Sequence, residues 1–146
     1  VFDKSPGFLG NEKAVQLMLD YRDKGNDVVL MSMIRDPFDT ITSQYELWGG
    51  DIKEREEQWI KKYDHLYGLR DDHPEINLYR YELFSHDPIT YGTQMFEKCD
   101  LQPYDYCFDH IKPVNEGRWR KSTNRYVQKW KPSKKFMARA ELYQYA

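Results

Sequence analysis

Apolar and polar residues along the chain are spaced as in helices in some segments and as in strands in others. Residues 28–34, Val-Val-Leu-Met-Ser-Met-Ile, form a near-continuous apolar run, as expected of a parallel strand that is covered on both faces. A helix is predicted on each side of this run, over residues 11–24 and from Pro37, and Asp36 suits the N-cap of the second helix. The order helix, strand, helix predicts an α/β layer fold.

The three- and four-residue spacing of apolar side chains predicts the buried face of each of these helices. In the first helix the predicted face consists of Ala14, Leu17, Met18 and Tyr21. In the second helix it consists of Phe38, Ile41, Tyr45 and Trp48. Ser43 lies off the second face and is therefore free to contact a ligand.

The rest of the chain continues the mixed pattern. A long helix is predicted over residues 51–69, and its inward side chains are Trp59, Ile60, Tyr63, Leu66 and Tyr67. A short strand is predicted over residues 76–81, a loop over 101–115 and a terminal helix over 133–145. Another helix is predicted to begin at the cap Asp87-Pro88, and the residues on one of its sides are Ile89, Gly92, Met95, Phe96 and Cys99. Two strands are few for an independent sheet. The 146 residues fit one domain, residues 1–146.

Composition narrows the function classes. No apolar run approaches the roughly 18 residues of a membrane span, so no membrane segment is predicted. Cys99 and Cys107 lack metal-ligand spacing and are interpreted as reduced thiols, and no metal site is predicted. The four histidines have no catalytic or metal motif around them and are predicted to lie on the surface: His65, His73, His86 and His110.

Positive charge is concentrated near the C-terminus. Between residues 112 and 135 one acid, Glu116, accompanies nine bases: Lys112, Arg118, Arg120, Lys121, Arg125, Lys129, Lys131, Lys134 and Lys135. Such a cluster attracts anions, although a solvated helix face is an equally good interpretation for most of the lysines. Nucleic acid is not the expected partner, because the basic run is confined to one segment.

Arg35 and Ser43 form a candidate anion site. Arg35 stands at the carboxyl end of the predicted strand, where α/β sheets usually bind their ligands. Ser43 lies about two turns into the following helix, about 10 Å along its axis. The alternative for Arg35 is a salt bridge to Asp36 or Asp39, and for Ser43 a solvent-facing position.

This pair resembles the 3′-phosphate-binding motif of sulfotransferases that use 3′-phosphoadenosine 5′-phosphosulfate (PAPS), in which a serine follows a strand-end arginine by eight positions. Three further segments, Asn77-Leu-Tyr-Arg-Tyr-Glu-Leu83 with Asp87-Pro88, Gly117-Arg-Trp-Arg-Lys121 and Asp3-Lys-Ser-Pro6, are similar to motifs of that family. The matches run in the family's order from residue 3 to about residue 121.

The resemblance implies a three-layer αβα fold related to P-loop kinases and transfer of a sulfuryl group from PAPS, without a metal, to a hydroxyl or amine of an unidentified acceptor. It implies that Arg35 pairs with the donor's 3′-phosphate, that Ser43 adds a hydrogen bond, and that Tyr81 lies near the adenine. Lys4 would approach the transferred sulfuryl group. Catalysis of this kind depends mainly on positioning and charge stabilisation.

The resemblance also assigns the basic segment to the region that closes over the nucleotide. Arg118, Arg120 and Lys121 are the candidates there, but Pro113-Val-Asn-Glu-Gly117 replaces the family's Arg-Lys-Gly triplet. Which of the three bases meets the phosphate is left open. Glu82 is interpreted as a brace between loops and is assigned no chemistry.

One departure from the family pattern leaves two functions open. The chain has no strand followed by a Pro-Lys-Ser-Gly-Thr-Thr phosphate loop, which binds the 5′-phosphosulfate in the family. We therefore expect the chain to be the later part of a longer protein, incomplete at its N-terminus. The alternative is a non-catalytic anion- or nucleotide-binding module of the same fold. A kinase-like enzyme is disfavoured because no acidic pair in a magnesium-site context accompanies Arg35.

Overall fold

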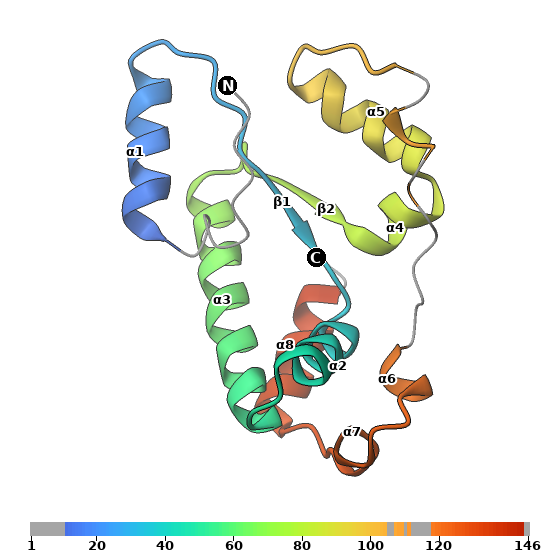
Figure 1. The fold of residues 1–146 in the computed structure, drawn as a ribbon. Coiled ribbons are helices and arrows are strands. Elements are labelled where there is room, and N and C mark those ends of the chain that lie inside the picture. The colour runs from blue at the N-terminus through green and yellow to red at the C-terminus, as the bar shows by residue number, and fades with distance from the viewer. Residues whose placement is uncertain (1–10, 105–106, 110, 112–117, 145–146) are drawn as a thin grey trace.

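The computed structural model describes residues 11–104, 107–109, 111 and 118–144. This part of the chain is α/β and mostly helical, with a small two-stranded parallel sheet (Figure 1). The elements, in chain order, are α1 (Glu12–Asp23), β1 (Met31–Ile34), α2 (Pro37–Trp48), α3 (Ile52–Asp72), β2 (Asn77–Arg80), α4 (Tyr81–His86), α5 (Pro88–Lys98), α6 (Arg118–Lys121), α7 (Arg125–Lys129) and α8 (Lys134–Gln144).

The two strands lie side by side and end at the same edge. They pair in parallel from Met31 opposite Asn77 to Ile34 opposite Arg80. Both predicted strands and their parallel arrangement are confirmed, although each strand is shorter than its apolar run. In Figure 1, α1 and α3 lie to the left of the strand pair and α5 lies to the right. Because parallel strands share a direction, the residues that follow β1 and β2 meet at one edge of the sheet.

The start of α2 follows the prediction from its capping residues. The Asp36 carboxylate accepts a hydrogen bond from the Asp39 backbone N–H at 2.9 Å, and Pro37 occupies the first turn. Ile41 is completely buried, as predicted. Trp48 was assigned to the same face, and this prediction is wrong, because its side chain is 68% exposed. Trp48 is the last residue of α2, and the Arg55 guanidinium lies over its ring, 6.0 Å from the centroid.

A cluster of apolar side chains joins α2, α3 and α8. Its buried members are Ile41, Trp59, Ile60, Phe136 and Ala140. The Trp59 and Phe136 rings meet edge to face, with centroids 5.3 Å apart. The predicted inward face of α3 is confirmed, since Trp59, Ile60, Leu66 and Tyr67 are all buried. Phe38, in the first turn of α2, packs against this cluster.

A buried carboxylate fastens the segment before α8 to α3. Glu56 on α3 is 3% exposed and accepts hydrogen bonds from the Trp130 indole N–H at 2.5 Å and from the Ser133 backbone N–H at 3.1 Å. Ser133 in turn caps α8, since its hydroxyl accepts the Phe136 N–H at 3.1 Å. The entry of the chain into α8 is thus set by hydrogen bonds to one carboxylate.

The buried face of α1 differs from the prediction. Val15 and Leu19 are buried, whereas Leu17 and Tyr21 are 63% and 54% exposed. Both pairs have the four-residue spacing of a helix stripe, so the spacing alone does not choose between them. Which pair is buried depends on which side of α1 packs against the rest of the molecule.

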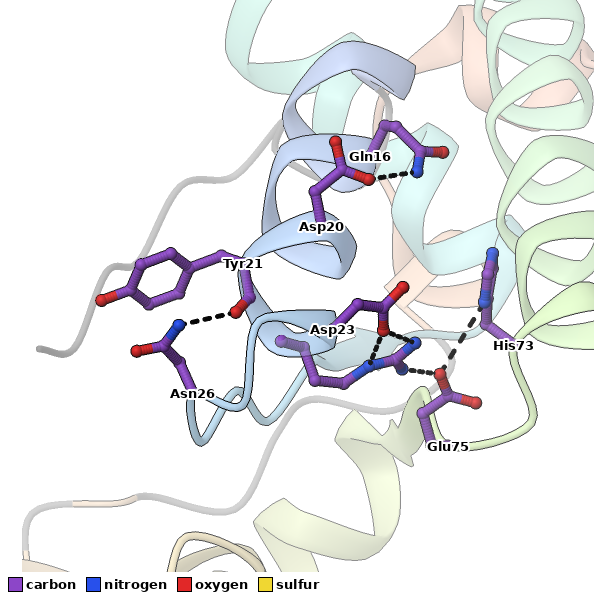
Figure 2. A network of polar contacts seen from close by, with 8 residues as sticks. Gln16, Asp20, Tyr21, Asp23, Asn26, His73 and Glu75 are labelled. Atoms are coloured by element: carbon purple, nitrogen blue, oxygen red, sulfur yellow. Dashed lines mark hydrogen bonds and ion pairs between the residues drawn. The ribbon is translucent and has the colours of Figure 1, made fainter.

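Polar contacts hold the C-terminal end of α1 to the segment between α3 and β2 (Figure 2). Arg22 forms ion pairs with Asp23 on its own helix and with Glu75. Glu75 also lies 3.7 Å from the His73 ring, measured between Oε1 and Nδ1. The Asn26 amide donates to the Tyr21 carbonyl at 2.8 Å and closes the turn after the helix. These contacts link α1 to the start of β2.

The predicted helix after Asp87-Pro88 is confirmed as α5, and it packs against the residues that follow it. Phe108 lies over Gly92, and a Cβ atom at Gly92 would lie 2.2 Å from the Phe108 ring. Ile89 was predicted on this side but is 66% exposed. The short helices α4, α6 and α7 were not predicted, because segments of four to six residues show no clear helical period.

Candidate functional site

The candidate site lies at the carboxyl ends of the two strands. Arg35 directly follows β1, and Arg80 is the last residue of β2. Asp36, the N-cap of α2, and Glu82, in the first turn of α4, complete this edge of the sheet. A cavity of about 140 Å³ opens here, and these four residues line it together with Ile34, Pro37, Trp59, Tyr63, Leu83, Ala140 and Tyr143. The site that the sequence predicted at a strand end is therefore hollow and carries charge.

Arg35 is held in place through both its backbone and its side chain. Its backbone N–H donates to the Tyr63 hydroxyl at 3.2 Å, and that hydroxyl donates to the Arg35 carbonyl at 3.3 Å. Its guanidinium lies over the Tyr81 ring, 5.1 Å from the centroid. Burial raises the pKa of the Tyr63 phenol, so the hydroxyl stays neutral and keeps both hydrogen bonds.

The Arg35 side chain lacks a hydrogen-bonding partner within the described part of the chain. Its Nε is buried and unpaired, and its guanidinium forms no ion pair with any described carboxylate. The alternative salt bridge to Asp36 or Asp39 is therefore not found among the described contacts. A buried guanidinium N–H without an acceptor is costly, since leaving a buried donor unpaired costs about 1–3 kcal/mol. An oxyanion in the cavity would supply the acceptor.

Glu82 braces the two strand ends, as the sequence interpretation expected. Its Oε1 accepts the Asp36 backbone N–H at 2.8 Å. Burial raises the pKa of the Asp36 carboxyl, and the negative charges of Asp39 and Glu82 add to the rise. The carboxylates of Asp36 and Glu82 thus both accept hydrogen bonds from backbone N–H groups near the start of α2.

Ser43 and the basic segment meet on α2. Ser43 is half-buried, and the hydrogen bonds and ion pairs of the described residues do not join it to Arg35. Helix α6 packs against α2. The Ser122 hydroxyl, just after α6, donates to Glu46 at 2.5 Å, and Glu46 lies one turn beyond Ser43 on the same side of the helix. The basic segment is therefore attached to α2 close to Ser43.

The structure places the predicted site residues unequally. It brings Arg35 and Tyr81 into contact and puts the backbone of α6 against α2. Arg120 and Lys121 are exposed on α6, while the Arg118 side chain lies outside the described part of the chain, as does Lys4. Tyr81 is half-buried, which leaves part of its ring accessible beside Arg35.

Sequence reasoning missed Arg80 and Tyr63 as parts of the site. Arg80 was read only as part of a motif, and its position opposite Ile34 follows from the strand register. Tyr63 was assigned to the core, but its hydroxyl reaches the Arg35 backbone from α3, 28 residues away in sequence. Two basic residues at the ends of adjacent predicted parallel strands would have been the available signal for Arg80.

His65 is less exposed than a surface histidine, since 23% of its side-chain surface is accessible. Its Nε2 is buried and has no hydrogen-bond partner among the described residues, and its Nδ1 lies 3.9 Å from Glu12 Oε1. The ring lies between α3 and the start of α1, which the sequence pattern does not bring together. His86 is exposed, as predicted, and His110 lies outside the described residues.

A larger cavity of about 580 Å³ lies beside β2, between the end of α3 and α5. Its lining includes Arg70, Tyr79 and Lys98 but none of the residues around Arg35. Within the residues that the structure describes, no group of three or more His, Cys, Asp and Glu side chains could hold a metal ion, and none of the helices is long and apolar enough to cross a membrane.

Comparisons with protein-family models, with curated proteins and with solved structures gave no match for this chain.

Proposed function

We propose that this chain provides the 3′-phosphate and adenine side of the donor site of a PAPS-dependent sulfotransferase. The observation that carries the proposal is the buried, unpaired Nε of Arg35 at the carboxyl end of β1. Its guanidinium lies over Tyr81, at the position where the family resemblance expects an aromatic residue near the adenine. An arginine held in this way offers a phosphate group several N–H donors in a rigid planar fork.

The other residues take the roles that the resemblance implies. Ser43 would donate a neutral hydrogen bond to the same phosphate. Of the bases on α6, Arg120 and Lys121 are exposed, and α6 is anchored next to Ser43 through Ser122 and Glu46. This attachment supports a role for the basic segment in closing over the nucleotide. Lys4 would stabilise charge on the transferred sulfuryl group.

The fold that we propose for the complete sheet is a three-layer αβα arrangement of the P-loop-kinase type, with β1 and β2 as two of its parallel strands. Parallel sheets are normally covered by helices on both faces, and two four-residue strands are fewer than such a sheet requires. The parallel pairing and the near-continuous apolar sequence of residues 28–34 support this arrangement.

Calorimetric titration with two nucleotides tests the donor assignment. The first is 3′-phosphoadenosine 5′-phosphate (PAP), the desulfated donor, and the second is AMP, which lacks the 3′-phosphate. We expect Arg35→Ala to weaken PAP binding by about 1.5–3 kcal/mol, the size of a hydrogen bond to a charged group, and to leave AMP binding unchanged. PAP binding that is no tighter than AMP binding in the wild-type chain would refute the proposal.

Arg55→Ala is a matched control for this experiment. Arg55, on α3, also lies over an aromatic ring, that of Trp48. Trp48 is the last residue of α2, whereas Arg35 precedes the first turn of that helix. We expect this variant to bind PAP like the wild type. An equal loss in both variants would mean that overall charge, and not the strand-end site, determines affinity.

One observation favours the alternative of a non-catalytic module: the sequence contains no phosphate-loop motif. The two functions differ in turnover. A sulfotransferase releases PAP from PAPS in the presence of a suitable phenol, peptide or glycan acceptor. Binding of PAP that depends on Arg35, without release of PAP across such a panel, would support the module.

A further inference from the structure

We infer that Arg80 is a second cation of the anion site, so that one oxyanion group is held between the guanidinium groups of Arg35 and Arg80. The inference rests on the proposed function for the identity of that group, the 3′-phosphate of the nucleotide. Neither the sequence motifs nor the family resemblance assigns Arg80 a role.

The strand pairing places the two arginines at the same edge of the sheet. Arg80 is paired with Ile34, the residue directly before Arg35. Neighbouring strands lie about 4.8 Å apart, so the backbone positions of the two arginines are close at the strand ends. Both residues line the cavity at the strand ends.

The cavity has the size of one oxyanion. Its volume is about 140 Å³. A water molecule occupies about 30 Å³ in the liquid, so a tetrahedral phosphate or sulfate group fits, whereas pockets for drug-sized molecules start near 300 Å³. The rest of a nucleotide would therefore lie outside this cavity, toward Tyr81 and α2.

Neither arginine forms an ion pair with a described side chain. Two other arginines have carboxylate partners: Arg22 pairs with Glu75, and Arg139 lies 3.0 Å from Asp64. No described carboxylate forms an ion pair with Arg35 or Arg80. The two acids in the cavity lining, Asp36 and Glu82, have their hydrogen bonds directed to backbone N–H groups.

A purely structural role for Arg80 is the competing interpretation. Burial raises the pKa of the Tyr67 phenol, and the positive charges of Arg70 and Arg80 oppose that rise, so both arginines lie near Tyr67. Arg70 does not line the strand-end cavity. Arg70→Ala is therefore the matched control, because it removes a charge near Tyr67 without changing the anion site.

The experiment measures binding of two probes, inorganic sulfate and PAP, to the wild type and to Arg80→Ala, Arg80→Lys and Arg70→Ala. Sulfate binding is followed by the rise in melting temperature with concentration. We expect Arg80→Ala to weaken the binding of both probes by about ten- to a hundredfold, since a hydrogen bond to a charged group contributes about 1.5–3 kcal/mol and every 1.4 kcal/mol is about tenfold. Arg80→Lys should recover part of the loss, and Arg70→Ala should bind as the wild type does.

The outcomes separate this inference from the proposed function. The inference is wrong if the Arg80→Ala variant folds and binds both probes like the wild type. It is also wrong if Arg70→Ala loses as much affinity as Arg80→Ala does. PAP binding that depends on Arg35 but not on Arg80 leaves the sulfotransferase proposal standing alone. Sulfate binding that depends on both arginines, with no preference for PAP over AMP, supports the two-arginine site and refutes the nucleotide donor.

Discussion

The carboxylate of Glu82 accepts a hydrogen bond from the backbone N–H of Asp36 at 2.8 Å. This contact joins the first turn of α4 to the N-cap of α2, and through them the ends of β2 and β1. It closes one side of the cavity that Arg35 and Arg80 line. The candidate site is thus braced by a carboxylate that is hydrogen-bonded to the backbone.

Removing this brace should destabilise the fold without removing a charge that attracts anions. We expect Glu82→Ala to lower the free energy of unfolding by about 1–3 kcal/mol, because the half-buried Asp36 N–H loses its acceptor. Chemical denaturation measures the change. The exposed Glu141→Ala is the control and should stay within about 0.5 kcal/mol of the wild type. Equal stabilities of the two variants would show that the contact contributes nothing.

The hydrogen bonds of the buried Glu56 carboxylate should contribute more to stability than the contact between Glu82 and Asp36. Its carboxylate accepts two hydrogen bonds while 3% exposed, so Glu56→Ala should cost about 2–4 kcal/mol through two unpaired donors and a cavity. Glu57→Ala, at the next position of α3, is exposed and should change stability by less than about 0.5 kcal/mol. Urea unfolding, followed by tryptophan fluorescence, compares the stabilities of the two variants. Equal stabilities would show that the Glu56 hydrogen bonds do not stabilise the fold.

Two glycines should respond in opposite directions to alanine. At Gly92 the new Cβ would meet the Phe108 ring at 2.2 Å, so Gly92→Ala should destabilise the protein by about 1–3 kcal/mol. At Gly68, in the exposed interior of α3, nothing lies within 4 Å, and alanine should stabilise the helix by about 0.5–1 kcal/mol. Thermal unfolding measures both.

The clash at Gly92 has its own test. In the background of Phe108→Ala, the cost of Gly92→Ala should largely disappear, because the ring that it meets is gone. An undiminished cost in the double variant would locate the strain elsewhere than in the contact between Gly92 and Phe108.

The Tyr143 phenol should lose its proton at a higher pH than an ordinary tyrosine does. Burial raises its pKa to about 12, and its hydrogen bond to the Asp64 carboxylate adds to the rise. The folded state therefore retains this proton above the ordinary value of 10, and the stability that it contributes is present below pH 10 and is lost as pH rises toward 12. The difference in unfolding free energy between the wild type and Tyr143→Phe should accordingly shrink over that interval.

Tyrosinate absorbance gives a second measure of the same group. The titration curve of the wild type minus that of Tyr143→Phe should show one phenol with a midpoint near 12. In Asp64→Asn that midpoint should move down, since the carboxylate charge is removed. A difference curve centred at the ordinary value would show that Tyr143 is not held by Asp64.

The sequence alone predicted the features that depend on near neighbours along the chain. The N-cap Asp36, the first-turn Pro37, the inward face of α3 and the position of Arg35 after a strand follow from capping and spacing within about one or two turns. The first strand is predicted by its apolar run and the second by alternation over residues 76–81, and the structure shows both strands, paired in parallel.

Only the tertiary structure decided which distant groups meet. The pairing of Ile34 with Arg80, the Glu82 brace across 46 residues and the Glu56 contact with Trp130 across 74 residues depend on register and on packing. The choice between Val15 with Leu19 and Leu17 with Tyr21 on α1 is of the same kind. Local spacing creates both stripes, but burial goes to the one that the rest of the fold covers, and a one-residue shift in strand register would change which residue lies opposite Ile34.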